Sequence, residues 1–553
     1  MHYDAGIAEL LLRRSDDDRP GLLFESDSWS WREVVSAASV RAAIAQGLRR
    51  PGPFHVGLLL ENVPEYLFWL GGASMIGAAV VGINPTRRGS ELATDINHSD
   101  CQLIVTDPAG ARNLAALGIS VPEDRILVLG SDRYQALLAA CDTAALPPPP
   151  DPNGNLMLLF TSGSTSAPKL VNCTSGRLAF LGERAGRDYQ FSQSDVCYCA
   201  MPLFHGNALM AVWAPALYVG AAMALRRKFS ASGFVADIQR FQATFFNYVG
   251  KSLSYILAVP ETEEDGRNEL RFGYGTEASW KDIATFERRF RCRLIESYGM
   301  SEGGGVRVRW NPESPRDSIG RPDSPTMAIM NPDTLQPCPP AQFDEAGHLL
   351  NPAEAIGEIV NTAGLVLFEG YYRNPEAEAE RSRNGWFWSG DLAYQDSEGW
   401  YYFAGRGSDR LRVDSENFTA APIERILYRH PMIRGAAVYA VPDPDGGDAV
   451  MAALELEGDA TTFDSLDFES FLAEQPDLGS KWVPRFVRIM SQLPLTGSNK
   501  VVKAPLRNGG WRTDDPVWWR ADSRAPGFSL MTEADKQEHN DRFLERGRAS
   551  ALR

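Results

Sequence analysis

The chain has 553 residues, with 55 Lys and Arg against 71 Asp and Glu, so its formal net charge at pH 7 is −16. This acidic balance argues against a nucleic-acid-binding protein, because a surface that follows phosphates needs an excess of basic residues. With 44% hydrophobic and 23% charged residues, the composition excludes a largely disordered chain. The length exceeds what one hydrophobic core usually supports, so we expect several folding units.

The sequence predicts a cytoplasmic protein without a transmembrane segment. Its N-terminus lacks the basic stretch and long apolar run of a secretory signal, and its seven scattered cysteines are typical of reduced thiols. One uncharged stretch, from Tyr66 to Thr86, imitates a membrane helix. Gly77 divides it into a helix-like half and a β-branched half closed by Pro85, so we expect a buried helix followed by a strand.

The chain order of the predicted elements indicates an α/β fold. Apolar strands alternate with amphipathic helices over the first 140 residues and again over residues 195–300, which is typical of parallel βα units. Between residues 318 and 404, short runs at 357–364, 367–372 and 399–405 predict antiparallel strands or a small barrel. After Arg406, about 100 residues read as a small α+β domain.

The first motif that carries chemistry is LLFTSGSTSAPKLV, from Leu158 to Val171. A strand leads into a loop whose N–H groups and hydroxyls suit phosphate oxygens, and Lys169 adds a point charge. The spacing of the Walker loop is absent. Taken alone, the motif also fits an ordinary surface loop.

The second motif, ESYGMSEGGG, begins at Glu296. Tyr298 can stack on a base, Ser301 can bond a phosphate, and Glu302 offers the oxygen ligand that Mg²⁺ prefers. The alternative is a plain turn after a strand.

Two further motifs lie near the C-terminus. Asp391, next to Gly390, can accept from two vicinal ribose hydroxyls, and Arg406 can reach ribose or phosphate. Lys500 ends a polar turn in LPLTGSNKVVK. A surface ion pair and a solvated lysine are the simpler interpretations of these residues.

Taken together and in this order, the four motifs resemble those of the adenylate-forming (AMP-binding) superfamily over residues from about 20 to 507. The segments 244–257, 273–280 and 408–424 are most similar to very-long-chain acyl-CoA synthetases, including mycobacterial fatty-acid–CoA ligases. The resemblance implies a large N-terminal domain, residues 1–406, and a mobile C-terminal domain, residues 407–510, with residues 511–553 as an extension. ATP and a carboxylate would bind between the two domains.

The resemblance also implies roles for individual residues. The phosphate loop would comprise Thr161, Ser162, Gly163, Ser164, Thr165 and Lys169, and the adenine would lie among Gly275, Thr276, Glu277 and Tyr298. Ser301 and Glu302 would face the α-phosphate and Mg²⁺, Asp391 and Arg406 the ribose, and Lys500 would be the catalytic lysine of adenylation. Gly303, Asn247 and His205 would border the acid substrate, although His205 also fits a core histidine.

The implied activity is an ATP- and Mg²⁺-dependent, AMP-forming ligase that adenylates a carboxylic acid and passes the acyl group to CoA. Ser166 and Leu170 replace glycines of the phosphate loop, and Ser415 replaces a glycine of the loop that lines the CoA tunnel. These departures leave a CoA-independent alternative, an ATP-dependent diazotase that activates nitrite for coupling to an aryl amine. A non-catalytic binding protein is the third interpretation, and the joint retention of Lys500, Glu302, Asp391 and Arg406 argues against it.

Overall fold

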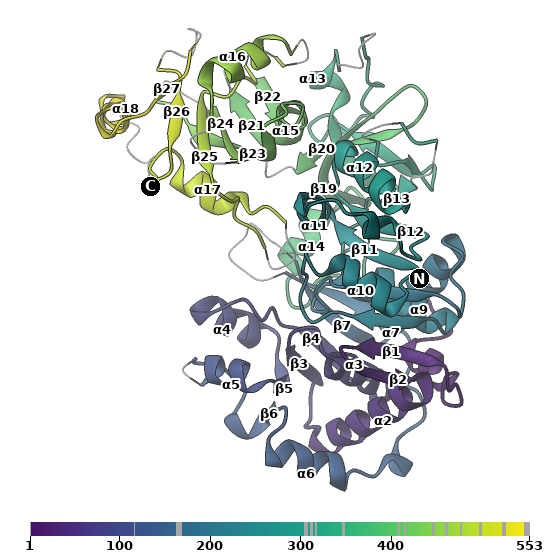
Figure 1. The fold of residues 1–553 in the computed structure, drawn as a ribbon. Coiled ribbons are helices and arrows are strands. Elements are labelled where there is room, and N and C mark those ends of the chain that lie inside the picture. The colour runs from purple at the N-terminus through teal and green to yellow at the C-terminus, as the bar shows by residue number, and fades with distance from the viewer. Residues whose placement is uncertain are drawn as a thin grey trace. The chain divides into compact units, whose positions relative to one another are not determined.

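The protein folds as two compact units, shown in the computed structural model of Figure 1. One unit comprises residues 1–307 and 363–387, and the other comprises residues 308–362 and 388–553. The predicted domain boundaries at residues 406 and 510 stay predictions. The structure describes residues 2–115, 117–161, 169–303, 308–309, 313–315, 318–344, 349–406, 410–413, 416–444, 448–458, 463–475, 478–479, 481–496, 500–521 and 527–546.

The first unit contains a six-stranded sheet in the order β6-β5-β3-β4-β7-β8. All neighbours are parallel except the β7–β8 hairpin. The strands are β3 (His55–Leu59), β4 (Ala79–Gly82), β5 (Cys101–Thr106), β6 (Ile126–Val128), β7 (Asn155–Thr161) and β8 (Lys169–Thr174). The helices in this part are α2 (Trp31–Leu48), α3 (Pro64–Ile76), α4 (Gly89–His98), α5 (Pro108–Leu114) and α6 (Asp132–Ala140).

The uncharged stretch from Tyr66 folds as predicted. Its first half belongs to α3, in which every residue from Tyr66 to Ile76 is buried, and Gly77 ends the helix in a left-handed conformation, with φ 67°. The second half contains β4 at the centre of the sheet. Within the described ranges, no helix has both the length and the apolar character needed to cross a membrane.

A seven-stranded sheet completes the core of the first unit, in the order β13-β12-β11-β9-β10-β1-β2. Only β1 and β2 are antiparallel, which confirms the prediction of parallel βα units. The strands are β1 (Pro20–Phe24), β2 (Asp27–Ser30), β9 (Val196–Cys199), β10 (Ala222–Leu225), β11 (Phe245–Val249), β12 (Phe272–Thr276) and β13 (Arg293–Glu296).

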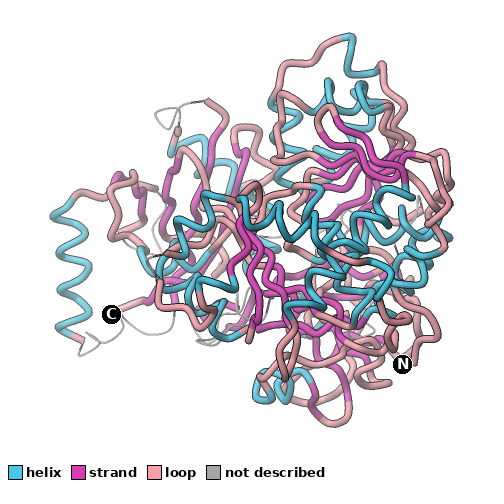
Figure 2. The backbone as a smooth tube through the Cα atoms, turned by 90° about the horizontal axis from the view of Figure 1, so that it is seen from below, coloured by secondary structure: helices cyan, strands magenta, loops and turns pink. Residues whose placement is uncertain are grey.

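The helices of the first unit outside residues 31–140 are among the cyan tubes of Figure 2. They are α1 (Ile7–Leu12), α7 (Ser175–Asp188), α8 (Gly206–Ala208), α9 (Ala214–Val219), α10 (Phe234–Phe241), α11 (Gly250–Ala258), α12 (Trp280–Phe290) and α14 (Pro375–Arg381), with a π-helix at Leu209–Trp213. Phe234, Phe246, Phe286 and Phe290 pack together where α10 and α12 cover the sheet, with ring centroids 4.3–6.0 Å apart.

The second unit begins with short antiparallel strands, as the Gly- and Pro-rich sequence predicts. They are β14 (Val308–Arg309), β15 (Arg321–Pro322), β16 (Met327–Met330), β17 (Gly357–Asn361), β19 (Trp386–Gln395), β20 (Tyr401–Arg406), β21 (Arg410–Val413) and β22 (Glu416–Thr419), with α13 at Pro352–Ala355. In the first unit, β18 (Ser382–Arg383) pairs with the first residues of β19. The predicted strand at 367–372 is wrong, because this segment forms turns with one isolated bridge, Tyr371 to Val171.

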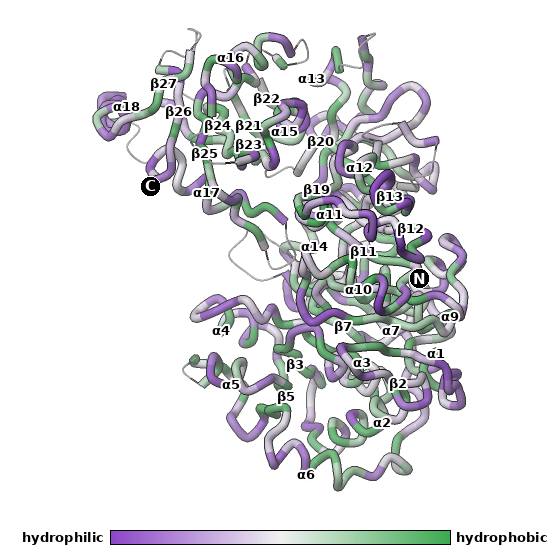
Figure 3. The backbone as a smooth tube through the Cα atoms, viewed as in Figure 1, coloured by the Kyte–Doolittle hydropathy of each residue, from purple (hydrophilic) through white to green (hydrophobic). Residues whose placement is uncertain are grey.

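A five-stranded sheet, β23-β24-β25-β26-β27, forms the rest of the second unit. Its elements are β23 (Ile433–Pro442), β24 (Asp448–Leu456), β25 (Phe486–Met490), β26 (Val517–Trp519), β27 (Ser529–Leu530), α15 (Ala420–Leu427), α16 (Ser465–Ala473), α17 (Lys503–Gly509) and α18 (Glu533–Glu545). The segment after residue 511 therefore adds two strands to the sheet. α18 is largely hydrophilic in Figure 3, but its Phe543 is buried and stacks on Trp511 with 5.8 Å between ring centroids.

Candidate functional site

The predicted phosphate loop joins the two strands of the β7–β8 hairpin. Thr161, the last residue of β7, pairs with Lys169, the first residue of β8. Ser162, Gly163, Ser164 and Thr165 lie outside the described residues. The structure therefore places the two ends of the loop side by side, on the edge strand β8 and its neighbour β7 in the six-stranded sheet.

Lys169 is a buried cation at this hairpin. Its side chain is 10% exposed, and its Nζ donates to Oε2 of Glu380 at 3.1 Å. The same Nζ lies 5.9 Å from the centroid of the Tyr371 ring. The backbone bridge between Tyr371 and Val171 holds this ring next to β8.

Glu302 is a buried anion that also contacts Tyr371. Its side chain is 7% exposed, its Oε1 accepts from the Tyr371 hydroxyl at 2.7 Å, and Nη2 of Arg381 lies 3.8 Å from the same oxygen. Burial, followed by the charge of Glu302, raises the pKa of the Tyr371 hydroxyl well above its usual range, so this hydroxyl stays a donor. One tyrosine thus contacts both the predicted phosphate lysine and the predicted metal carboxylate.

Arg177 of α7 holds the backbone on both sides of Glu302. This buried side chain donates through Nη2 to the carbonyl of Ser301 at 2.7 Å. Gly303 has φ 69°, and a Cβ at this position would lie 2.3 Å from Nη2 of Arg177. Glycine is therefore required for this close approach.

The predicted adenine segment lies at the ends of β12 and β13. Gly275 and Thr276 end β12, and Glu277 follows with φ 68°. The carbonyl of Gly275 accepts from the backbone N–H and the hydroxyl of Ser297, at 2.8 and 2.9 Å, so the residue before Tyr298 contacts this segment. Parallel strands thus bring Gly275 and Tyr298 into one region of the sheet edge.

Glu296, the last residue of β13, is hydrogen-bonded to β11 and to the residue that follows Glu277. Its Oε1 accepts from the Tyr248 hydroxyl at 2.7 Å, and its Oε2 accepts from the N–H of Ala278 at 3.4 Å. Burial raises the pKa of the Glu296 carboxyl to about 7, although the Tyr248 hydrogen bond lowers it. At the start of α11, a Cβ on Gly250 would lie 1.8 Å from the carbonyl oxygen of Glu277, so α11 packs directly against the segment.

The predicted acid-binding residues come from β11 and the start of α8. Asn247 is buried on β11, and its Nδ2 donates to Oδ1 of Asn207 at 2.8 Å. His205, two residues before Asn207, packs on Phe204 with 4.6 Å between ring centroids. A π-helix follows at Leu209–Trp213, and such interruptions are frequent at functional sites.

The remaining predicted residues belong to the second unit. Asp391 on β19 and Arg406, the last residue of β20, are direct partners in the antiparallel register. Lys500 is half-buried, its N–H donates to the hydroxyl of Thr496 at 3.0 Å, and its carbonyl accepts from the Thr496 N–H at 2.7 Å. Whether these residues act in one site with Lys169 and Glu302 stays a prediction.

Four neighbours of the predicted residues were not identified from the sequence: Arg177, Tyr371, Glu380 and Arg381. Tyr371 lies in the segment 367–372, for which the sequence predicts a strand. Glu380 and Arg381 look like part of an exposed helix end. Asn207 was also missed, although it lies within the MPLFHGNAL segment that contains His205.

The carboxylate at Glu302 fits a magnesium ion that arrives with nucleotide. In the described part of the chain, no three His, Cys, Asp or Glu side chains are grouped so that they could hold a metal ion. Mg²⁺ keeps several waters and binds through one or two carboxylates together with substrate phosphates, so a single buried carboxylate suffices.

Comparison with known proteins identifies the family. The AMP-binding enzyme family matches residues 12–372, and the AMP-binding enzyme C-terminal domain matches residues 422–500. A steroid-22-oyl-CoA synthetase of Rhodococcus jostii is 51% identical over 548 residues, covering 99% of this chain and 98% of that protein. A medium/long-chain-fatty-acid–CoA ligase of Mycobacterium tuberculosis is 43% identical, covering 93% of this chain and 98% of that protein.

A likeness in fold extends over both units. ATP-bound MatB from Rhodopseudomonas palustris superposes with a TM-score of 0.77 at 22% identity, covering 91% of this chain and 98% of that one. These relatives do not favour the nitrite-activating alternative. The chain belongs to the AMP-binding enzyme family and is an AMP-forming acid–thiol ligase, which adenylates a carboxylic acid and transfers the acyl group to CoA.

Proposed function

We propose that the acid is a steroid carboxylic acid, activated with Mg²⁺ and ATP and released as its CoA thioester in the cytoplasm. The name of the 51% identical relative supports this substrate class, since the similarity covers 99% of the chain. Long-chain fatty acids are a second class, supported by the name of the 43% identical relative.

The observation that carries the proposed use of ATP is the grouping of Lys169, Tyr371 and Glu302. A carboxylate must approach an α-phosphate that is itself anionic, so negative charge has to be neutralised before a bond can form. A buried ammonium and a buried carboxylate that contact the same tyrosine offer one group for phosphate oxygens and one for a cation. Glu302 would hold Mg²⁺, and the ion would supply positive charge to the phosphates.

The other predicted residues have proposed roles in the same reaction. Gly275, Thr276, Glu277 and Tyr298 would enclose the adenine, Ser301 would face the α-phosphate, and Asp391 and Arg406 would hold the ribose. Lys500 would neutralise the charge that develops as the acid oxygen bonds to the α-phosphorus and pyrophosphate leaves. In the second step the CoA sulfur bonds to the acyl carbon, the thiol proton is lost, and AMP leaves.

Asn247, His205 and Gly303 would border the acid. The Asn247–Asn207 amide pair supports this assignment, because it puts polar groups into an otherwise apolar region of β11. A steroid acid needs mainly apolar contacts, with a few polar groups that fix its orientation.

The test is a substrate panel with ATP, Mg²⁺ and CoA. We expect a CoA thioester by mass spectrometry, with AMP and pyrophosphate formed in equal amounts, and the highest kcat/KM for an acid with a steroid nucleus. A higher kcat/KM for long-chain fatty acids would assign the second class instead. Pyrophosphate release with nitrite and an aryl amine, but with no acid, would overturn the proposal.

A further inference from the structure

The last turn of α14 carries two adjacent residues of opposite charge, Glu380 and Arg381, and each contacts a site residue of the opposite sign. Glu380 pairs with Lys169 at 3.1 Å, and Arg381 lies 3.8 Å from Glu302. Nε of Arg381 also donates to the Tyr371 hydroxyl at 3.2 Å. One helix end therefore supplies counter-charges to both ionic groups of the proposed nucleotide site.

The burial of the four side chains is unequal. Lys169 and Glu302 are 10% and 7% exposed, whereas Glu380 is 62% and Arg381 is 21% exposed. A buried charge without a partner is costly, so these two contacts stabilise Lys169 and Glu302 in the absence of ligand. Because Glu380 is mostly in solvent, it can leave Lys169 at small cost.

Bound nucleotide would compete with both contacts. Phosphate oxygens on Lys169 would repel the Glu380 carboxylate around the same ammonium group, and a cation on Glu302 would repel the Arg381 guanidinium. The two neighbours on α14 therefore mimic the charges of the ligand, with an anion where phosphate would bind and a cation where Mg²⁺ would bind.

We propose that Glu380 and Arg381 are positioning residues that hold Lys169 and Glu302 ready in the nucleotide-free enzyme, and that Mg²⁺–ATP replaces both contacts. This inference rests on the proposed function through the roles given to Lys169 and Glu302. Its consequence is that the two contacts lower the affinity for Mg²⁺–ATP, because binding must break them.

The first test removes the charge of Glu380. Glu380→Gln should lower the Kd of Mg²⁺–ATP in titration calorimetry by about twofold to fivefold, the range expected when one exposed ion pair is lost. The KM for ATP should fall by a similar factor with kcat unchanged. Glu376→Gln is the matched control, because it removes an exposed carboxylate from the first turn of the same helix, and its Kd should equal that of the wild type.

The second test removes the charge of Arg381. Arg381→Gln should lower the Mg²⁺ concentration for half-maximal pyrophosphate release by about threefold, because a cation no longer opposes Mg²⁺ at Glu302. Arg383→Gln, an equal change of charge at an exposed position two residues later, should leave that concentration unchanged. If Arg381→Gln does not fold, Glu380→Gln alone decides the matter, since its side chain is already 62% exposed.

Damage to the structure alone would raise KM or lower kcat, whereas the inference requires a lower KM at constant kcat. An unchanged or raised Kd in Glu380→Gln, or the same shift in Glu376→Gln, would overturn it. Failure of the proposed function looks different: the wild type would bind Mg²⁺–ATP but release no pyrophosphate with any acid.

Discussion

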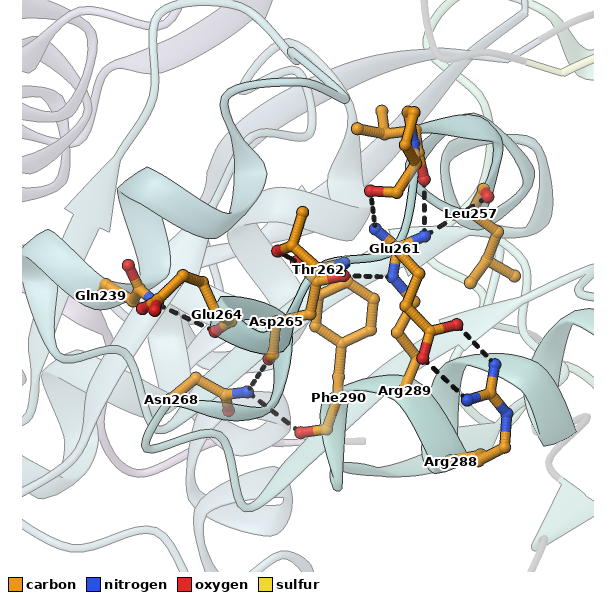
Figure 4. Close-up of polar contacts among 12 residues, drawn as sticks. Gln239, Leu257, Glu261, Thr262, Glu264, Asp265, Asn268, Arg288, Arg289 and Phe290 are labelled. Carbon is orange, nitrogen blue, oxygen red and sulfur yellow. Dashed lines mark hydrogen bonds and ion pairs between the residues drawn. The ribbon is translucent and has the colours of Figure 1, made fainter.

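Replacing Arg289 with Met is expected to destabilise the first unit by about 3–5 kcal/mol, the usual cost of removing one partner from a buried ion pair. Nε of Arg289 lies 2.5 Å from Oδ2 of Asp265, and each side chain is 3% exposed (Figure 4). Without the guanidinium, the Asp265 carboxylate would keep only its hydrogen bonds from the N–H and hydroxyl of Thr262, at 3.0 and 2.9 Å.

The same guanidinium also caps the C-terminal end of α11. It donates to the carbonyls of Leu257, Val259 and Pro260 at 3.4, 2.7 and 3.2 Å. Carbonyls at a helix end lack partners within the helix and need donors from elsewhere. Because the first residue of α11 packs against Glu277, the variant should also raise the KM for ATP.

Arg288 provides the matched control one residue earlier in α12. It pairs with Glu261 at 2.7 Å, but the two side chains are 61% and 48% exposed, so Arg288→Met should cost about 1 kcal/mol or less. Both variants would be unfolded in urea and followed by tryptophan fluorescence, with free energies taken from the same transition. If Arg289→Met costs no more than Arg288→Met, the reasoning is wrong. Adding Asp265→Asn to Arg289→Met should restore part of the loss, since no unpaired charge then stays buried.

Three further predictions concern the site. Lys500→Ala should abolish pyrophosphate release while a synthetic acyl-adenylate is still converted to thioester with CoA; equal loss in both assays would contradict the role of Lys500. Glu302→Gln should lower kcat for adenylation by about 10²–10³-fold and raise the Mg²⁺ requirement, and a loss below tenfold would speak against a metal carboxylate. The raised pKa of Glu296, about 7 against the usual 4.5, means that the folded protein holds a proton that the unfolded chain releases, so stability should fall as pH rises from about 4.5 to 7 and then level off. Glu296→Gln should remove up to about 3 kcal/mol of this pH dependence in urea titrations at pH 5 and pH 8, whereas an unchanged slope would assign the titration to other groups.

Local patterns were enough to predict the parts of the fold in which sequence neighbours decide the structure. The helix at Trp31–Leu48 and the break at Gly77 follow from amphipathic spacing and from a glycine that can adopt a left-handed conformation. The strands expected at 357–364 and 399–405 also form, as β17 and β20, and each pairs antiparallel with a neighbouring strand. In the helix and at the break, the interactions lie within a few residues.

The segment 367–372 shows where local pattern fails. Alternating apolar residues and aromatics predicted a strand, yet the structure has turns and one bridge, from Tyr371 to Val171. Around this bridge, Asn172 N–H donates to the carbonyl of Gly370 at 3.1 Å and Tyr372 N–H to the carbonyl of Leu170 at 2.7 Å. Next to it, the carboxylate of Glu369 accepts from the N–H and hydroxyl of Thr174, both at 2.7 Å, so side-chain bonds continue the contact with β8. Such partners lie 195 residues away and leave no trace in a short window of sequence.

Sequence motifs therefore indicate which residues bind a ligand. They say less about which residues those side chains contact when the ligand is absent. Lys169 and Glu302 each lie in a motif whose composition indicates phosphate or metal chemistry, but Glu380 and Arg381 lie in a seven-residue helix that looks like any solvated surface turn. A buried charge in a binding site still needs a counter-charge in the ligand-free protein, because the free-energy cost of burying an unpaired charge is present whether or not the ligand is bound. An exposed residue of opposite charge next to a buried motif residue is therefore a physical sign of a counter-charge, and only the structure shows it. In this chain the sign is found in the last turn of α14.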